Sequence, residues 1–321
     1  MGWKKIFDMV NVDAIFIKNC NDDNFFYFTK AEGLHENSIA IITKEGAKII
    51  STPLEKEGIF YHTKEELKKI LKEFLDEKNV GFNGENLSYN DFINLRKTVK
   101  ANFIDVSKQI KEVRAIKDKE EIRKIRKSCL LTLKAIEELD FYKKREKDVA
   151  FEIDCKINRE AKIAFPTIVA FGKNTSIPHH LPSKKLFSNP AIVDCGAKYR
   201  GYCCDITRCF YGAREKRLYE IVNEALDIAI DELREGINGR EVYKKIEKFF
   251  SKYKFKMLHG LGHSIGLNVH DGYSIGKNSN FIFKENMVFA IEPAIYKKNF
   301  GIRIEEDVLI KKNRAEILSR R

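Results

Sequence analysis

The stretch AIVDCGAKYRGYCCDITRCF, residues 191–210, decides the fold of the second part of this 321-residue chain. It holds two apolar runs separated by a short polar segment, which is the pattern of an antiparallel β-hairpin. With the tip of the hairpin at Tyr199 and Arg200, Asp194 lies directly opposite Asp205 on the same face. Like charges in this arrangement destabilise a sheet unless a cation lies between them.

A second hairpin repeats this arrangement of acidic residues. Residues 287–292 form an apolar run that ends in Glu292, and residues 301–310 are predicted to return beside it. The turn pairs Glu292 with Glu305, or with Glu306 if the turn differs by one residue. Four carboxylates on two hairpins suit a pair of hard divalent cations about 3.5–4 Å apart, so the sequence predicts a two-metal hydrolytic site.

A third segment adds histidines to these acids. The run HGLGHSIGLNVH, residues 259–270, contains His259, His263 and His270. Its spacing is like that of a zinc-protease helix, but its glycines disfavour a helix, and Gly260 stands where such a helix has a glutamate. We therefore expect a loop that runs into a strand, with one imidazole available as a metal ligand and others as hydrogen-bond donors.

The order of the expected elements divides the chain into two domains, residues 1–114 and residues 115–321. The first alternates strands and helices, and the second carries two rounds of two helices followed by strands. In the first domain we expect strands at 13–18, 25–30 and 80–82, a hairpin at 38–51 and helices at 63–76 and 88–99. In the second we expect helices at 118–138, 147–162, 215–233 and 238–252. Two further histidines, His35 and His62, lack any such context and are expected at the surface.

Composition and charge exclude several classes of protein. The chain is 43% hydrophobic, which excludes general disorder, and it has no apolar run near the ~20 residues of a membrane span. The 18 basic and 18 acidic residues of positions 1–114 cancel, so the net charge of +12 lies in positions 115–321. These basic residues are mixed with acids, which disfavours nucleic-acid binding. The seven cysteines form no CxxC pair and the N-terminus lacks a signal-peptide pattern, so we expect reduced thiols in a cytoplasmic protein.

The motif set resembles the metallopeptidases of the pita-bread fold, which include methionine aminopeptidase, aminopeptidase P and prolidase. The resemblance rests on VDCGA, DITR, HGLGHSIGLNVH, EPAIY and GIRIEED, while GFNGENLSY and IAIITKEGAKIIST resemble the creatinase-like N-terminal domain of the proline-specific branch. It implies an α+β fold, with a C-terminal pita-bread catalytic domain at 115–321 and a smaller α/β creatinase-like domain at 1–114. It also implies two divalent metal ions, held by Asp194, Asp205, His263, Glu292 and Glu305.

Several features favour the Xaa-Pro branch of this family. Methionine aminopeptidases usually lack residues that match His259 and Arg303, and they lack the N-terminal domain. The run NTSIPH matches the substrate-side histidine of the branch at His179. By this resemblance Glu292 transfers the proton, His270 and His179 stabilise the oxyanion, and His259 and Arg303 orient the substrate or the ligands.

The resemblance further implies a homodimer that hydrolyses the bond before proline in a dipeptide or short peptide, as an Xaa-Pro dipeptidase or an aminopeptidase P. An oxygen-rich ligand shell with one histidine favours Mn²⁺ or Co²⁺ over Fe²⁺ or Zn²⁺. Two alternatives stay open: a methionine aminopeptidase, and a non-enzymatic binding protein on the same fold. Departures from the family pattern occur at Asp271, which follows His270 where many members have glutamate, and at Cys195 and Cys204, which lie beside the predicted ligands.

Overall fold

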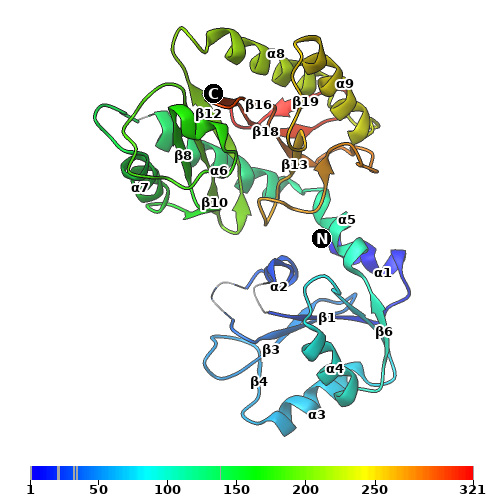
Figure 1. The fold of residues 1–321 in the computed structure, drawn as a ribbon. Coiled ribbons are helices and arrows are strands. Elements are labelled where there is room, and N and C mark those ends of the chain that lie inside the picture. Colours follow the sequence, from blue (N-terminus) through cyan, green and yellow to red (C-terminus); the bar gives the residue numbers. More distant parts are fainter. Residues whose placement is uncertain (1, 20–21, 32, 34, 138, 321) are drawn as a thin grey trace. The chain divides into compact units, whose positions relative to one another are not determined.

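The computed structural model describes residues 2–19, 22–31, 33, 35–137 and 139–320, and the chain divides into two compact units, Met1–Arg114 and Ala115–Arg321. Figure 1 shows both units along the chain. Within the described residues, no helix has the length and apolar character needed to cross a bilayer.

The first unit is built on one six-stranded mixed sheet with the strand order β4-β3-β2-β1-β5-β6. Its pairings β1–β2 and β2–β3 are antiparallel, whereas β1–β5, β5–β6 and β3–β4 are parallel. The elements are η1 (Gly2–Lys5), α1 (Ile6–Met9), β1 (Ala14–Lys18), α2 (Asp23–Thr29), β2 (Ile39–Ile42), β3 (Ala47–Ser51), β4 (Ile59–Phe60), α3 (Lys64–Leu75), β5 (Asn79–Phe82), α4 (Tyr89–Thr98), β6 (Asn102–Asp105) and α5 (Ser107–Ala115).

Most local expectations for this unit are confirmed. The hairpin at 38–51 forms as β2 and β3, and the helices expected at 63–76 and 88–99 form as α3 and α4. The side chain of Thr63 accepts a hydrogen bond from the backbone N–H of Glu66, and that of Ser88 accepts one from Asp91. These caps satisfy backbone N–H groups that have no partner inside the helix.

The expected strand at 25–30 is wrong, because α2 occupies this segment. The helix begins after Asp22, whose side chain accepts a hydrogen bond from the backbone N–H of Asn24, and it ends at Lys30 in the left-handed region with a φ of 58°. Both end signals are those of a short helix, and they outweigh the strand preference of the aromatic residues between them.

The expected surface position of His35 is also wrong. Only 2% of this side chain is exposed, and its ring packs against Phe25 with a centroid distance of 5.5 Å. Phe25 belongs to α2, so the helix contributes to the burial of His35. His62 is exposed, as expected.

The second unit contains two pairs of helices, each followed by strands, as the sequence predicts. Its elements are α6 (Lys119–Glu137), α7 (Glu146–Ile157), β7 (Lys162–Ile163), β8 (Ile168–Phe171), η2 (Gly172–Ser176), β9 (Ala191–Cys195), β10 (Ala197–Tyr199), β11 (Tyr202–Cys203), β12 (Ile206–Phe210), α8 (Lys216–Glu232), α9 (Gly239–Lys252), β13 (Gly262–Ser264), β14 (Ser274–Ile275), β15 (Val288–Ile291), β16 (Ala294–Tyr296), β17 (Gly301–Arg303), β18 (Glu306–Ile310) and β19 (Ala315–Ile317). The helix expected to continue to residue 162 ends at Ile157.

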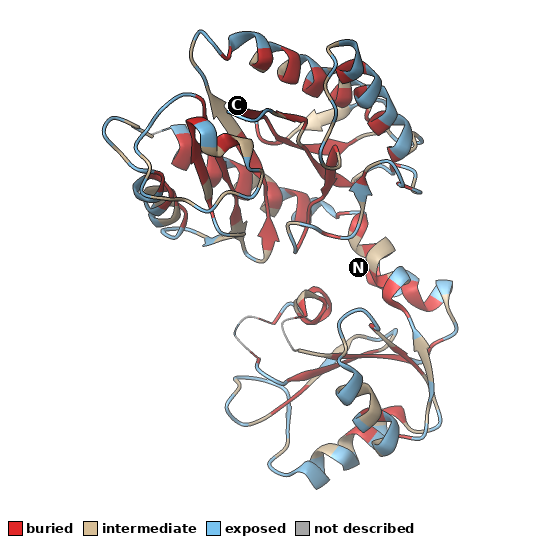
Figure 2. Cartoon of the chain, in the orientation of Figure 1, coloured by how far each residue is buried: buried red, intermediate tan, exposed pale blue. Residues whose placement is uncertain are grey.

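Each helix pair covers its own group of strands. Helix α6 packs on β10 and β11, and α7 packs on β8, whose sheet has the order β12-β9-β8. Helices α8 and α9 lie side by side over the second group, which includes the five-stranded sheet β14-β13-β15-β18-β19 (Figure 1). The strands of both groups are mostly buried, whereas α8 and α9 expose their outer faces (Figure 2).

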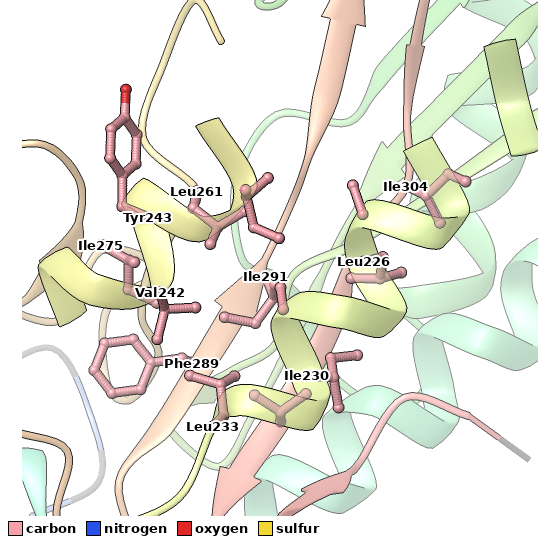
Figure 3. Close-up of a cluster of buried hydrophobic side chains, with 14 of the residues drawn as sticks. Leu226, Ile230, Leu233, Val242, Tyr243, Leu261, Ile275, Phe289, Ile291 and Ile304 are labelled. Carbon is pink, nitrogen blue, oxygen red and sulfur yellow. The ribbon is translucent and has the colours of Figure 1, made fainter. Parts of the chain in front are cut away.

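The larger core lies between α8, α9 and the second group of strands. Figure 3 shows Leu226 and Ile230 of α8 packed near Val242 of α9 and near Phe289 and Ile291 of β15. All five side chains are buried. Because each fully buried side chain of this size stabilises the fold by roughly 1.5–3 kcal/mol, this core holds β15 rigidly beneath the helices.

The register of the first hairpin differs from the expected one by two residues. Asp194 pairs with Thr207, so it does not lie directly opposite Asp205. The tip consists of Arg200 and Gly201, both with positive φ, which is the turn that suits the twist of a two-residue hairpin. An even shift keeps both aspartates on one face of the hairpin, as diagonal neighbours.

The register of the second hairpin agrees with one of the two expected pairings. Ile291 pairs with Glu306 and Ala294 pairs with Arg303. The same register places Glu292 opposite Glu305 rather than Glu306. The two acidic pairs thus lie on two hairpins whose registers are now defined.

Gly196 supplies a test of the first hairpin. A Cβ at this position would lie 1.9 Å from the backbone oxygen of Cys204, so we expect Gly196→Ala to force the two strands apart. The expected loss of stability is at least about 1–3 kcal/mol, measured as a lower guanidinium unfolding midpoint. Gly276→Ala is the matched control, because nothing lies within 4 Å of its Cβ. Equal midpoints for the two variants would contradict the close approach at Gly196.

Candidate metal centre and active site

The predicted acidic ligands lie at the ends of strands in the second unit. Asp194 is in β9, Asp205 precedes β12, Glu292 follows β15 and Glu305 precedes β18. The side chains of Asp205, His263 and Glu305 are buried, and one ligand atom from each lies within 4.8 Å of the others. Nε2 of His263 also lies 3.8 Å from Oε1 of Glu292. Strand ends from both hairpins, together with β13, therefore bring these side chains together.

Burial and mutual repulsion disfavour the charged forms of these carboxylates. Burial, followed by the charges of Glu305 and Asp194, raises the pKa of Asp205 well above its usual value. Burial and the charge of Glu292 raise the pKa of Glu305 in the same direction. Burial raises the pKa of Glu292 to about 7, against the opposing effect of Arg303. Such a cluster is stabilised by a bound proton or, with all acids ionised, by a cation.

Unpaired oxygen atoms support a cation rather than protons alone. In the part of the chain that the structure describes, Oδ1 of Asp194 and Oδ1 of Asp205 are buried and have no hydrogen-bond partner. Such atoms cost roughly 1–3 kcal/mol each, unless something satisfies them. Carboxylate oxygens with one imidazole are ligands that hard and borderline divalent cations prefer, so the residues present fit such ions.

His263 is held in the tautomer that a metal ligand requires. Its Nδ1–H donates to the backbone oxygen of Val269 at 3.0 Å, which leaves the lone pair of Nε2 directed at the acids. Nε2 lies 3.6 Å from Oδ2 of Asp205. Burial and the neighbouring His270 lower the pKa of His263 to about 3, so the ring is neutral at physiological pH. Neutral imidazole with a backbone-anchored Nδ1–H is the usual form of a ligating histidine.

Arg303 balances part of the negative charge. Its guanidinium is buried, and Nη2 donates to Oδ2 of Asp194 at 2.6 Å. Nε donates to Oγ1 of Thr207 at 3.2 Å, and Thr207 in turn donates to Oε2 of Glu305 at 2.7 Å. The guanidinium of Arg303 and the hydroxyl of Thr207 therefore fix the orientation of acids from both hairpins.

Tyr296 joins the site, although the sequence analysis did not select it. Nη1 of Arg303 donates to the tyrosine oxygen at 2.7 Å, and Nε2 of His259 lies 3.2 Å from that oxygen. Nδ1 of His259 lies 2.7 Å from the backbone oxygen of Gly260 and 3.9 Å from Oε2 of Glu292. Burial raises the pKa of Tyr296 to about 12, so its hydroxyl stays protonated. The sequence signal that could have identified Tyr296 is its position in the EPAIY motif, four residues after Glu292.

Asp307 supports the predicted ligand Asp205. Its Oδ2 accepts a hydrogen bond from the backbone N–H of Asp205 at 3.0 Å and lies 3.5 Å from Sγ of Cys129. Burial raises the pKa of Asp307 to about 8. Strand alternation predicts its side chain on the face of Glu305, but its role as a support was not predicted. Glu306, on the other face, instead accepts a hydrogen bond from Arg208 at 3.1 Å.

Two more predicted residues lie at the exposed side of the site. His270 is exposed and stacks on His263 with a centroid distance of 3.9 Å and an interplanar angle of 10°. His179 is exposed, and its charge contributes to lowering the pKa of both His270 and His259, after the effect of burial. Exposed imidazoles beside a buried acidic cluster are placed to contact a substrate rather than to support the fold.

The fold and the buried cluster of acids with a neutral imidazole define a metal-dependent hydrolase. Residues 123–312 match the metallopeptidase family M24, and residues 4–116 match the creatinase/prolidase N-terminal domain. The chain therefore belongs to metallopeptidase family M24, and its predicted place in the Xaa-Pro branch of the pita-bread fold is confirmed. It is a peptide hydrolase.

Relatives and solved structures extend this similarity over nearly the whole chain. An uncharacterized peptidase of Methanocaldococcus jannaschii is 41% identical over 67% of this chain and 66% of its own length. The Xaa-Pro dipeptidase of Pyrococcus furiosus is 32% identical over 98% of this chain and 96% of its own. The prolidase of Pyrococcus horikoshii OT3 superimposes with a TM-score of 0.88 at 30% identity, covering 99% of this chain and 97% of that one. The X-Pro aminopeptidase of Thermotoga maritima gives 0.87 at 28% identity, covering 99% and 98%.

Asp205 supplies a test of the metal centre. We expect Asp205→Asn to lose bound Mn²⁺, because the amide removes a charged ligand. We also expect the metal-free variant to be at least as stable as the metal-free parent, because like-charge repulsion falls. Metal content by elemental analysis and the melting temperature of chelator-treated protein check both parts. Asp231→Asn, at an exposed position on α8, is the control. An Asp205→Asn variant with full metal content would contradict the ligand assignment.

Proposed function

We propose that this chain is an Xaa-Pro dipeptidase that uses two divalent cations held by Asp194, Asp205, His263, Glu292 and Glu305. The observation that carries the proposal is the convergence of four acids from two hairpins with His263 of β13, with unpaired buried oxygens on Asp194 and Asp205. The dipeptidase form is supported by relatives of that name that align over nearly their full length. Mn²⁺ or Co²⁺ suits the oxygen-rich ligand set.

When bound, the cations would supply Lewis-acid polarisation of the scissile carbonyl and a lower pKa for the attacking water. Glu292 would move the proton. A carboxylate beside the attacking water is a side chain that can accept and return a proton. As a carboxylate it accepts a proton from the attacking water, and as an acid it gives that proton to the proline nitrogen as the peptide bond breaks.

The exposed imidazoles would act on the carbonyl oxygen. His270 and His179 each offer an N–H donor to the negative charge that develops on this oxygen as water adds. His270 is held against His263, so its ring is fixed before the substrate arrives. Arg303, Tyr296 and His259 form a connected chain of hydrogen bonds that would hold Asp194 in place.

Substrate length tests the proposed specificity. We expect the Mn²⁺- or Co²⁺-loaded protein to hydrolyse Ala-Pro and to leave Ala-Pro-Ala and Met-Ala uncleaved. Hydrolysis of Ala-Pro is measured as the release of free proline. Cleavage of Ala-Pro-Ala would assign an aminopeptidase P, and a preference for Met-Ala would assign a methionine aminopeptidase. Metal-loaded protein that cleaves none of the three peptides would refute the proposal and favour a binding protein on this fold.

His270 tests the proposed chemistry separately from metal binding. We expect His270→Ala to keep its metal content and to lose about 10²–10³-fold in kcat on Ala-Pro, because an oxyanion donor is removed. His62→Ala is the matched control, since His62 is an exposed histidine of the first unit. Wild-type kcat in His270→Ala would remove its proposed role.

A further inference from the structure

The carboxylate of Glu146 binds the loop that carries His179. Glu146 begins α7, and its side chain is fully buried. Oε1 accepts hydrogen bonds from the backbone N–H of Phe171 and from Nδ2 of Asn174, both at 2.8 Å. Oε2 accepts from Nε2 of His180 at 2.9 Å and from the backbone N–H of Ser183 at 2.9 Å, and the hydroxyl of Ser183 also donates to it. One side chain thus binds both ends of the segment 171–183.

The opposite side of this segment is tied to the strand that carries Arg303. The backbone N–H of Gly301 donates to Oγ1 of Thr175 at 2.9 Å. Nη1 of Arg303 donates to the backbone oxygen of Pro178 at 3.2 Å. The residue after Pro178 is His179, so the imidazole is positioned between contacts to Arg303 and to Glu146.

The charge of Glu146 makes these contacts strong. Burial alone would raise its pKa, but the hydrogen bonds from Ser183 and His180 lower it overall, so the group is ionised at neutral pH. Hydrogen bonds to an ionised acceptor are about twice as strong as neutral ones. A buried anion that loses a donor is strongly destabilised, so the loop is held in the one arrangement that satisfies Glu146.

We propose that Glu146 and His180 are positioning residues that hold the 171–183 loop so that His179 reaches the scissile carbonyl. The inference rests on the proposed function in one respect, because it takes His179 to act on the substrate. It also gives His180 a role that the sequence could not assign. The alternative is a purely structural role, in which the same contacts only stabilise α7.

A double-mutant cycle separates these roles. We expect His180→Leu to lower kcat on Ala-Pro about ten- to a hundredfold at unchanged Mn²⁺ content, and His180→Gln, which keeps an N–H donor, to restore most of the rate. In the His179→Ala background the same His180→Leu change should cost less than about twofold, because residues that act as a unit are not additive. A full further loss in that background would overturn the proposal, as would wild-type kcat in His180→Leu.

Hydrogen exchange gives a readout that does not need activity. We expect faster amide exchange over residues 171–183 in His180→Leu and in Ser183→Ala, unchanged exchange in α8 and α9, and no change in His62→Leu, the control at an exposed histidine. Unchanged exchange in the loop would contradict the proposal that Glu146 and His180 hold it. If the wild-type protein does not cleave Xaa-Pro peptides, the proposed function fails on that result, while loop exchange still decides whether Glu146 and His180 hold the loop.

Discussion

The burial of several carboxylates in one small volume is the constraint on which the second unit depends. Asp205 and Glu305 are almost fully buried, and burial together with the charges of neighbouring acids raises the pKa of each. A sheet could relieve this repulsion by separating the strands, but the register of both hairpins and the core beneath β15 prevent it. The repulsion is therefore stored in a rigid site, where a divalent cation relieves it. Metal binding and the stability of the folded unit are coupled for this reason.

The acids are held by hydrogen bonds from side chains around them. Arg303 and Thr207 connect Asp194 to Glu305, and Asp307 holds the backbone of Asp205. Each contact restricts one ligand to a single orientation, which lowers the entropy lost when a cation binds. Close packing of the strands also fixes the position of His263. A Cβ at Gly262 would lie 2.0 Å from a backbone oxygen of β15, so glycine at this position lets β13 lie close to β15.

The elements with a regular period could be predicted from the sequence, and so could the convergence of the acids. The side-chain period of two fixes which face each acid occupies, so a register error of two residues at Asp194 and Asp205 left the site intact. The strand expected at 25–30 failed because short helices depend on their caps more than on their aromatic residues. Tyr296 and Asp307 were missed because their roles come from contacts across strands, which no local pattern records.

Residues on loops are harder to place from sequence than residues on strands. This site contains residues of both kinds. The acids and His263 lie at strand ends, where backbone pairing fixes their positions. His179 lies on a loop with no ladder of hydrogen bonds, so side chains must supply what backbone pairing supplies elsewhere. Glu146 satisfies donors at both ends of that loop, and Arg303 reaches it from the metal centre. Because Arg303 also binds Asp194, a displacement of the loop would disturb the position of this acid as well. The loop and the acidic cluster are therefore held by one shared guanidinium, so the arrangement of either depends on the other.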